Sequence, residues 1–333
     1  SNISETILSL LLFFFFKICI KKSLFTRNPN LSLLPMQLII KKLLIIFTII
    51  ISLGFHHSNL FAETKPSFDD FGLISIMYHR FDEAKYPSTN IQLDIFMEHL
   101  EIIENQKIKF INPNYFEKSL SKDKKMPKIL LTVDDGLLSF YKNSWPILKD
   151  KKIPFLLFIN TREVGTFNYM DWSQILELHN SDLVEIGNHS HSHEYLVDEN
   201  YDFIKNDILK SIEIFEDKLG KNSDFFSYPF GEYSSEFKKI IKELGFKYAF
   251  GQHSGVIDET KDLFELPRFP INEKYGELKR FKSLMKTLPF KYIKITPEDK
   301  FLLQSKNPPN VIIEFVKNIK NLKQINCFSN EGN

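Results

Sequence analysis

The sequence has few cysteines and almost no net charge, and each shortage excludes a class of protein. Its 333 residues include two cysteines, Cys19 and Cys327, which are too few for a disulfide framework or a cysteine-rich zinc site. The 43 Lys and Arg residues balance 42 Asp and Glu residues, so the formal charge is +1. Nucleic-acid-binding proteins usually carry a basic surplus, and we therefore expect no nucleic-acid partner. Hydrophobic residues make up 43% of the chain, which is enough to bury a core and excludes a disordered chain.

The N-terminal part of the chain has the pattern of an export signal. Two lysines precede an apolar run over residues 43–55, and Ala62 is a small residue at the expected cleavage position. This pattern predicts a signal peptide over residues 36–62 that begins at Met36, after upstream translation over residues 1–35 and before a linker over residues 63–71. The alternative is an uncleaved N-terminal anchor. Both interpretations predict an exported protein, periplasmic or extracellular, that contacts the membrane only through this segment.

From Gly72 onward, short apolar runs alternate with amphipathic helical patterns. The runs predict buried strands, and the i, i+3, i+4, i+7 spacing between them predicts covering helices. The expected strands are 73–77, 129–133, 155–159, 183–186, 225–228 and 247–250, and the expected helices are 91–105, 139–149, 172–178, 201–219 and 235–244. Such alternation is typical of a parallel α/β sheet, and the number of units favours a distorted (β/α)7-type barrel over residues 72–306.

The pattern changes near the C-terminus. Asn307-Pro308-Pro309-Asn310 is a linker signal, and residues 311–315 then have the composition of a strand. We therefore expect a β-rich C-terminal segment over residues 307–333 that is the start of a second, truncated module.

Acidic and imidazole side chains follow two of the expected strands. Asp134 and Asp135 end the strand 129–133, and Gly136 permits a sharp turn there. His189 and His193 follow the strand 183–186. The C-terminal rim of a β/α fold is where catalytic residues collect, and two imidazoles with one carboxylate suit a catalytic zinc site with open positions. Cobalt, nickel or manganese would also accept these ligands.

These residues carry a resemblance to a known family. Thr-Val-Asp-Asp-Gly over residues 132–136 resembles the first motif of the polysaccharide deacetylase family, the NodB-homology domain of carbohydrate esterase family 4. His189-Ser-x-x-His193 resembles its second motif, and Ser-Tyr-Pro-Phe-Gly over residues 227–231 its third. The resemblance implies hydrolysis of N-acetyl groups on sugars of a polysaccharide, with Asp135, His189 and His193 holding the metal and Asp134 acting as general base.

The sequence departs from the family pattern in two places. Most members have an arginine where Ser227 stands, and we expect Arg268 to replace it as the partner of Asp134. The late Leu-x-His motif that supplies the general acid is missing, while His79 follows the first expected strand. This order is similar to the circularly permuted poly-N-acetylglucosamine deacetylases and makes His79 the expected acid, with His253 in reserve.

For other residues near the motifs, a structural role is the alternative to a functional one. We expect Tyr228 and Phe230 to contact the sugar, and a backbone N–H near Phe230 to stabilise the oxyanion together with the metal. Asp171 begins a helix and is equally suited to an N-cap or a substrate contact. Of the remaining histidines, His191 is expected to face solvent and His99 to lie on the surface of its helix.

Three other functions are compatible with parts of the pattern. The same residues could hydrolyse acetyl esters on xylan-like polymers, because one sequence does not reveal the shape of a pocket. A catalytically inactive sugar-binding module would be expected to lack a ligand or the base, yet all four of Asp134, Asp135, His189 and His193 are present. A serine hydrolase based on Ser139 or Ser190 would need a Gly-x-Ser-x-Gly elbow, which does not surround either serine.

Overall fold

The computed structural model describes residues 71–121, 126–302 and 309–315. The expected upstream segment, the signal peptide and all but the last residue of the expected linker lie outside the described residues, as do residues 316–333. Within the described ranges, no helix has both the length and the apolar character needed to cross a membrane.

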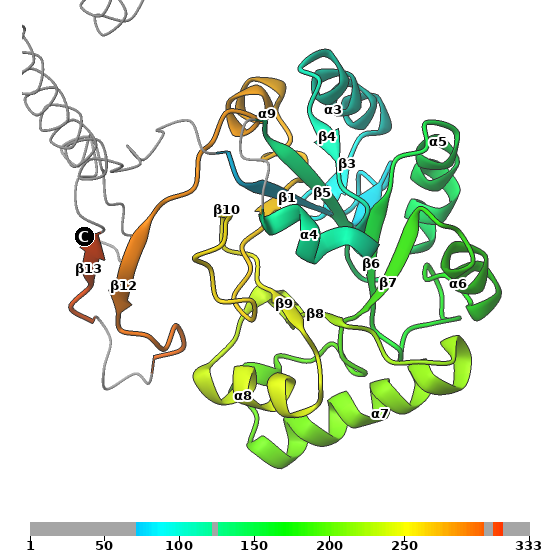
Figure 1. Cartoon of the computed structure of the whole chain (residues 1–333). Helices are drawn as coiled ribbons and strands as arrows, with labels where there is room; N and C mark the ends of the chain where they lie inside the picture. Colours follow the sequence, from blue (N-terminus) through cyan, green and yellow to red (C-terminus); the bar gives the residue numbers. More distant parts are fainter. Residues whose placement is uncertain (1–70, 122–125, 303–308, 316–333) are drawn as a thin grey trace, which may run out of the picture. The chain divides into compact units, whose positions relative to one another are not determined.

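A curled sheet of parallel strands forms the centre of the fold (Figure 1). The strands pair in the order β1, β5, β6, β7, β8, β9, and each neighbouring pair is parallel. Their bounds are β1 Leu73–Tyr78, β5 Lys128–Val133, β6 Phe155–Ile159, β7 Val184–Asn188, β8 Phe225–Ser227 and β9 Tyr248–Phe250. The predicted α/β class and parallel sheet are therefore confirmed.

An irregular segment closes the sheet into a distorted barrel. Leu266 pairs with Phe250 of β9, and β11 (Phe269–Pro270), which begins three residues further on, pairs in parallel with β1. The short strand β11 thus occupies the seventh position of the barrel. At the edges, β10 (Val256–Ile257) pairs antiparallel with β1, and β4 (Lys109–Phe110) pairs parallel with β5.

Seven described helices follow or flank the strands, mostly at the predicted positions. Their bounds are α3 Leu93–Asn105, α4 Phe116–Ser121, α5 Trp145–Asp150, α6 Trp172–His179, α7 Tyr201–Leu219, α8 Ser235–Glu243 and α9 Leu278–Leu284. The helix expected over residues 139–149 is interrupted, because a π-helical turn over Phe140–Ser144 precedes α5. Pro146 lacks an N–H and stands in the first turn of α5, a position that proline tolerates.

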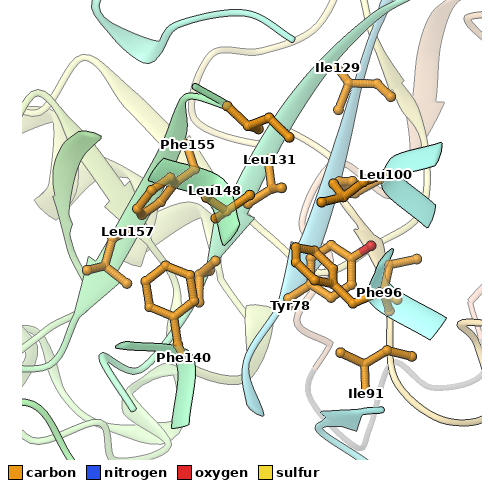
Figure 2. Close-up of a cluster of buried hydrophobic side chains, with 14 of the residues drawn as sticks. Tyr78, Ile91, Phe96, Leu100, Ile129, Leu131, Phe140, Leu148, Phe155 and Leu157 are labelled. Atoms are coloured by element: carbon orange, nitrogen blue, oxygen red, sulfur yellow. The ribbon is translucent and has the colours of Figure 1, made fainter. Parts of the chain in front are cut away.

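The pleat of the strands divides the core into an inner and an outer layer. Alternate residues such as Leu130, Leu156 and Phe250 fill the barrel, because successive side chains of a strand point to opposite faces. The other set packs outward against the helices, as Figure 2 shows for Tyr78, Leu131 and Leu157. By the same alternation, the residues that continue the inner rows beyond the strand ends reach the mouth of the barrel.

One buried histidine contradicts its sequence interpretation. His99 of α3 is fully buried, where one ring nitrogen lies 3.0 Å from the hydroxyl of Tyr78 and the other 2.6 Å from the carbonyl oxygen of Gly276. Its ring stacks on Phe281 of α9 at 3.8 Å. The expectation of a surface position was wrong, because residue 99 continues the apolar stripe of Phe96 and Ile103 at helical spacing.

The end of the described chain is a β-hairpin. β13 (Ile312–Phe315) lies where a strand was predicted, and it pairs antiparallel with β12 (Tyr292–Thr296). The expected boundary after residue 306 therefore separates the two strands of one hairpin. A strand needs a hydrogen-bonded partner, and this one finds it in the residues that the sequence pattern assigned to the barrel.

A second pair of short strands lies near the mouth of the barrel. There β2 (Arg80–Phe81) follows β1 and pairs in parallel with β3 (Asn90–Ile91).

Candidate active site and metal centre

The motif residues meet at the C-terminal ends of the parallel strands. His79 follows β1, Asp134 and Asp135 follow β5, His189 follows β7, and Phe230 lies in the turn after β8. Parallel strands end at the same edge of the sheet, so residues that are far apart in sequence share one mouth.

Asp135, His189 and His193 offer ligand atoms that all lie within 4.8 Å of one another. The Oδ1 atom of Asp135 lies 3.6 Å from Nε2 of His189 and 3.5 Å from Nε2 of His193. Among the described residues, neither this Oδ1 atom nor the buried Nε2 of His189 has a hydrogen-bond partner. Buried polar atoms are rarely left unpaired, and one carboxylate with two imidazoles is a donor set for a divalent cation. The residues therefore fit the expected metal.

Hydrogen bonds to the backbone hold the ligands in this arrangement. Nδ1 of His189 lies 2.6 Å from the carbonyl oxygen of Ser227 and donates to it, which directs Nε2 toward the other ligands. The Oγ atom of Ser190 accepts from the N–H of His193 at 3.0 Å. Burial lowers the pKa of His189 to about 4, more than the nearby carboxylates raise it. The imidazole is therefore neutral near pH 7, which is the form that binds metals.

Several of these residues adopt backbone conformations that non-glycine residues avoid. Asp135, Ser190, His193 and Phe230 have φ values of 76°, 70°, 53° and 58°. Each costs roughly 1 kcal/mol or more, and such residues collect at sites where geometry matters more than local stability. Asp135 and Gly136 turn the chain after β5, and this turn lets two adjacent aspartates serve one site.

Asp134 and Arg268 form a fully buried ion pair. The two guanidinium Nη atoms donate to the two carboxylate oxygens at 2.7 and 2.8 Å, and both side chains have no exposed surface. Arg268 also donates to the carbonyl oxygen of Gly251 and to the hydroxyl of Ser227. Arg268 thus pairs with Asp134 as expected, and the small side chain of Ser227 leaves room for it. Burial raises the pKa of Asp134, but Arg268 and His189 outweigh this effect and lower it to about 2.

His79 lies beside Asp134 at the mouth. The N–H of Asp134 donates to the carbonyl oxygen of Tyr78 at 2.9 Å, and β1 pairs with β5 in the register Tyr78 to Val133. His79 is half-buried, and its charge is among those that lower the pKa of Asp134. His253, the reserve candidate, is exposed and lies near Tyr233, with ring centroids 6.1 Å apart.

The two expected sugar-contacting aromatics have different surroundings. Phe230 is 49% exposed, and its ring centroid lies 4.9 Å from that of His193. Tyr228 is fully buried, and its hydroxyl donates to the carbonyl oxygen of Phe264 at 3.1 Å. The expectation that the Tyr228 ring contacts a sugar was wrong, because the pleat of β8 turns it away from the barrel interior and into the helical layer with Phe226 and Phe237.

Three other residues that were considered for function form structural contacts. Asp171 is the N-cap of α6 and forms a capping box with Gln174. His191 is half-buried, and its Nδ1 lies 2.9 Å from the hydroxyl of Thr161. Ser139 donates to Glu83 at 2.7 Å and has a structural role at the rim.

Two residues near the metal centre were missed by the sequence analysis. Arg80, next to His79, forms an ion pair with Glu83 at 3.0 Å. Tyr169 lies on the loop between β6 and α6, within electrostatic reach of Asp135. Tyr169 belongs to no motif, so only its position in space brings it to the site.

Comparison with known proteins agrees with this geometry. Residues 121–249 match the family model described as polysaccharide deacetylase. This match assigns residues 121–249 to the polysaccharide deacetylase family. The matched residues contain Asp134, Asp135, His189 and His193, whereas His79 precedes them and Arg268 follows them. The permuted order expected from the sequence has these same two residues outside the shared motifs.

Curated members of the deacetylase family match most of the chain. A poly-beta-1,6-N-acetyl-D-glucosamine N-deacetylase of Staphylococcus aureus strain N315 is 22% identical over 267 residues, which cover 71% of this chain and 92% of the relative. The protein of the same description from Staphylococcus epidermidis is 24% identical over 237 residues, covering 67% and 78%.

Solved deacetylase structures share the fold. IcaB from Ammonifex degensii superposes with a TM-score of 0.59 at 24% identity and covers 65% of this chain and 98% of its own. The Streptococcus pyogenes deacetylase PplD, solved in complex with acetate, gives a TM-score of 0.59 at 20% identity and covers 66% and 100%. At these identities the likeness establishes the distorted barrel.

Proposed function

We propose that this chain is a metal-dependent hydrolase that removes acetyl groups from the N-acetylated sugars of an exopolysaccharide. Zinc is the proposed cation, and export through the N-terminal segment is the proposed route to a periplasmic or extracellular substrate. The relatives described as poly-beta-1,6-N-acetyl-D-glucosamine deacetylases make that polymer the first candidate.

The observation that carries the proposal is a buried, ionised carboxylate beside a three-residue ligand set. Oδ2 of Asp134 lies 3.8 Å from Nε2 of His189, while Arg268 occupies the other side of the same carboxylate. Asp135, His189 and His193 leave positions for a water molecule and a substrate oxygen. An inactive sugar-binding module would have no use for this combination.

Hydrolysis of an amide needs activation of the carbonyl, a base and an acid. A bound divalent cation supplies the first by polarising the acetyl carbonyl and acidifying water. In the proposed mechanism, Asp134 accepts the proton of the attacking water. His79 donates a proton to the departing nitrogen, and a backbone N–H near Phe230 donates to the developing oxyanion. Breaking the C–N bond then releases acetate and a free amine on the sugar.

Acetate release from defined substrates tests the proposal. The full chain should release acetate from β-1,6-linked N-acetylglucosamine oligomers, lose this activity with a chelator and regain it with zinc. His193→Ala should be inactive under the same conditions. Faster release from acetylated xylan would favour the ester-hydrolase alternative, and no release from either polymer by the zinc-loaded chain would contradict the proposal.

A further inference from the structure

The metal centre is accessible from one side. The side chains of His193 and Asp135 are 24% and 17% exposed, whereas those of His189 and Asp134 are 1% and 0% exposed. A polymer cannot enter the barrel past buried groups, so it must approach over His193 and Asp135. The side chains that flank these two residues are therefore the ones that a sugar ring meets first.

Phe230 flanks the His193 side of this opening. Its exposed ring contacts the ring of His193 and also the ring of Tyr195, whose centroid lies 5.6 Å away. An exposed aromatic face of this kind suits the apolar face of a sugar ring but offers no hydrogen bond.

Tyr169 flanks the Asp135 side. The loop that carries it is joined to the residues directly after Asp135 by a bridge between Leu137 and Tyr169 and by a hydrogen bond from the N–H of Met170 to the carbonyl oxygen of Gly136 at 3.0 Å. The N–H of Leu138 also donates to the carbonyl oxygen of Asn168 at 2.8 Å. These contacts hold the backbone of Tyr169 close to the residues that directly follow Asp135.

The hydroxyl of Tyr169 is available to a ligand. Among the residues that the structure describes, none forms a hydrogen bond with it. The charges of Asp135, Arg80 and Glu83 all act on it, so it lies toward the mouth of the barrel. An ordinary tyrosine phenol is protonated near pH 7, so this hydroxyl can donate a hydrogen bond.

We propose that Tyr169 is a substrate-contacting residue that donates a hydrogen bond to a hydroxyl group of the N-acetylated sugar, opposite the apolar face of Phe230. The inference rests on the proposed function and deepens it. The metal and Asp134 act on the acetyl group alone, whereas Tyr169 and Phe230 recognise the sugar that bears it. Tyr169 thereby favours sugar acetamides over small acetyl compounds.

The test compares Tyr169→Phe with a matched Tyr115→Phe control. Tyr115 is 60% exposed and adjoins Phe116, which packs on Phe225 and Tyr248 at the opposite end of the barrel. Two substrates are used: a β-1,6-linked N-acetylglucosamine oligomer and 4-nitrophenyl acetate, which has no sugar hydroxyl. A single neutral hydrogen bond contributes about 0.5–1.5 kcal/mol, so in Tyr169→Phe the ratio of kcat/KM for the oligomer to that for the ester should fall roughly 2- to 13-fold.

Two further readouts separate recognition from structural damage. Zinc affinity by calorimetry and the melting temperature should match wild type in both variants, and the ratio should not change in Tyr115→Phe. An unchanged ratio in Tyr169→Phe would overturn the inference, as would an equal loss on both substrates accompanied by weaker zinc binding. Failure of the wild-type chain to act on the oligomer while it cleaves the ester would instead contradict the proposed function, and the inference with it.

Discussion

Adjacent aspartates at the end of β5 have different surroundings and therefore different chemistry. Asp134 is fully buried and shares both carboxylate oxygens with Arg268. Asp135 is partly exposed and turns an unpaired oxygen toward two imidazoles. The sequence identified both residues, but their division of roles depends on an arginine that lies 134 positions further along the chain.

At the residue scale, His79 is the sharpest test of acid catalysis. His79→Gln should lower turnover roughly 100- to 10,000-fold, the usual contribution of a general acid, while zinc affinity and melting temperature stay at the wild-type values. The matched control is His253→Gln, which should keep most of the activity. Near-wild-type turnover in His79→Gln, or a larger loss in His253→Gln, would contradict the assignment.

The buried ion pair predicts a strong coupling between Asp134 and Arg268. Removing one partner leaves the other charge buried and uncompensated, which costs about 3–5 kcal/mol. Asp134→Asn and Arg268→Met should each lower the free energy of unfolding by about that amount. The double variant should lose less than the sum, by about 1–3 kcal/mol, because no charge is then left unpaired. Urea unfolding of the apo proteins measures this cycle, and additive losses would show that the pair is not coupled.

At the scale of elements, α3 and α9 meet through a histidine. His99 stacks on Phe281 and contacts both Tyr78 of β1 and the carbonyl oxygen of Gly276. The sequence analysis assigned His99 to the surface of its helix, although residue 99 lies at helical spacing from the buried Phe96 and Ile103. Only the packing revealed that a polar ring can remain on the buried face, because two hydrogen-bonding groups from distant segments meet it.

This histidine predicts a pH-dependent stability. Burial lowers the pKa of His99 from its ordinary 6.5 to about 4, despite the hydrogen bond to Gly276 that raises it. Between these values the unfolded chain binds a proton that the folded chain does not. The stabilisation of the folded state that comes from neutral His99 is therefore present above pH 6.5. It is lost as the pH falls toward 4, by about 3 kcal/mol in total.

The comparison with His99→Gln isolates this effect from other titrating groups. Urea unfolding of the apo proteins at pH 7.5 and pH 4.5 should show a larger loss of stability in wild type than in the variant. Parallel losses in the two proteins would contradict a depressed pKa for His99.

At the scale of the whole molecule, the metal links strands that the barrel curvature brings together. Asp135 follows β5, and both histidines follow β7, with β6 between them. A cation that binds this set binds only the folded chain and so stabilises it. Zinc at 100 times its dissociation constant adds about 2.7 kcal/mol, which raises the melting temperature of a domain of this size roughly 5 to 10 °C.

Thermal unfolding with a chelator and with zinc measures this shift. His193→Ala removes one ligand and should abolish most of the increase in melting temperature, whereas the control His253→Gln should retain it. Equal melting temperatures of the wild-type protein with and without zinc would exclude a site formed by these three residues.

The sequence alone determined the strand and helix order, the barrel class and the motif residues, because these depend on local periodicity and on residues that directly follow buried strands. Packing decided the rest. Whether Arg268 reaches Asp134, whether Tyr228 faces the barrel or the helices, and which loop brings Tyr169 beside Asp135 depend on the curvature of the sheet and the pleat of each strand. Those properties arise from contacts between segments that are 36 to 134 residues apart in the cases of Tyr228 and Arg268, and the local sequence pattern does not contain them.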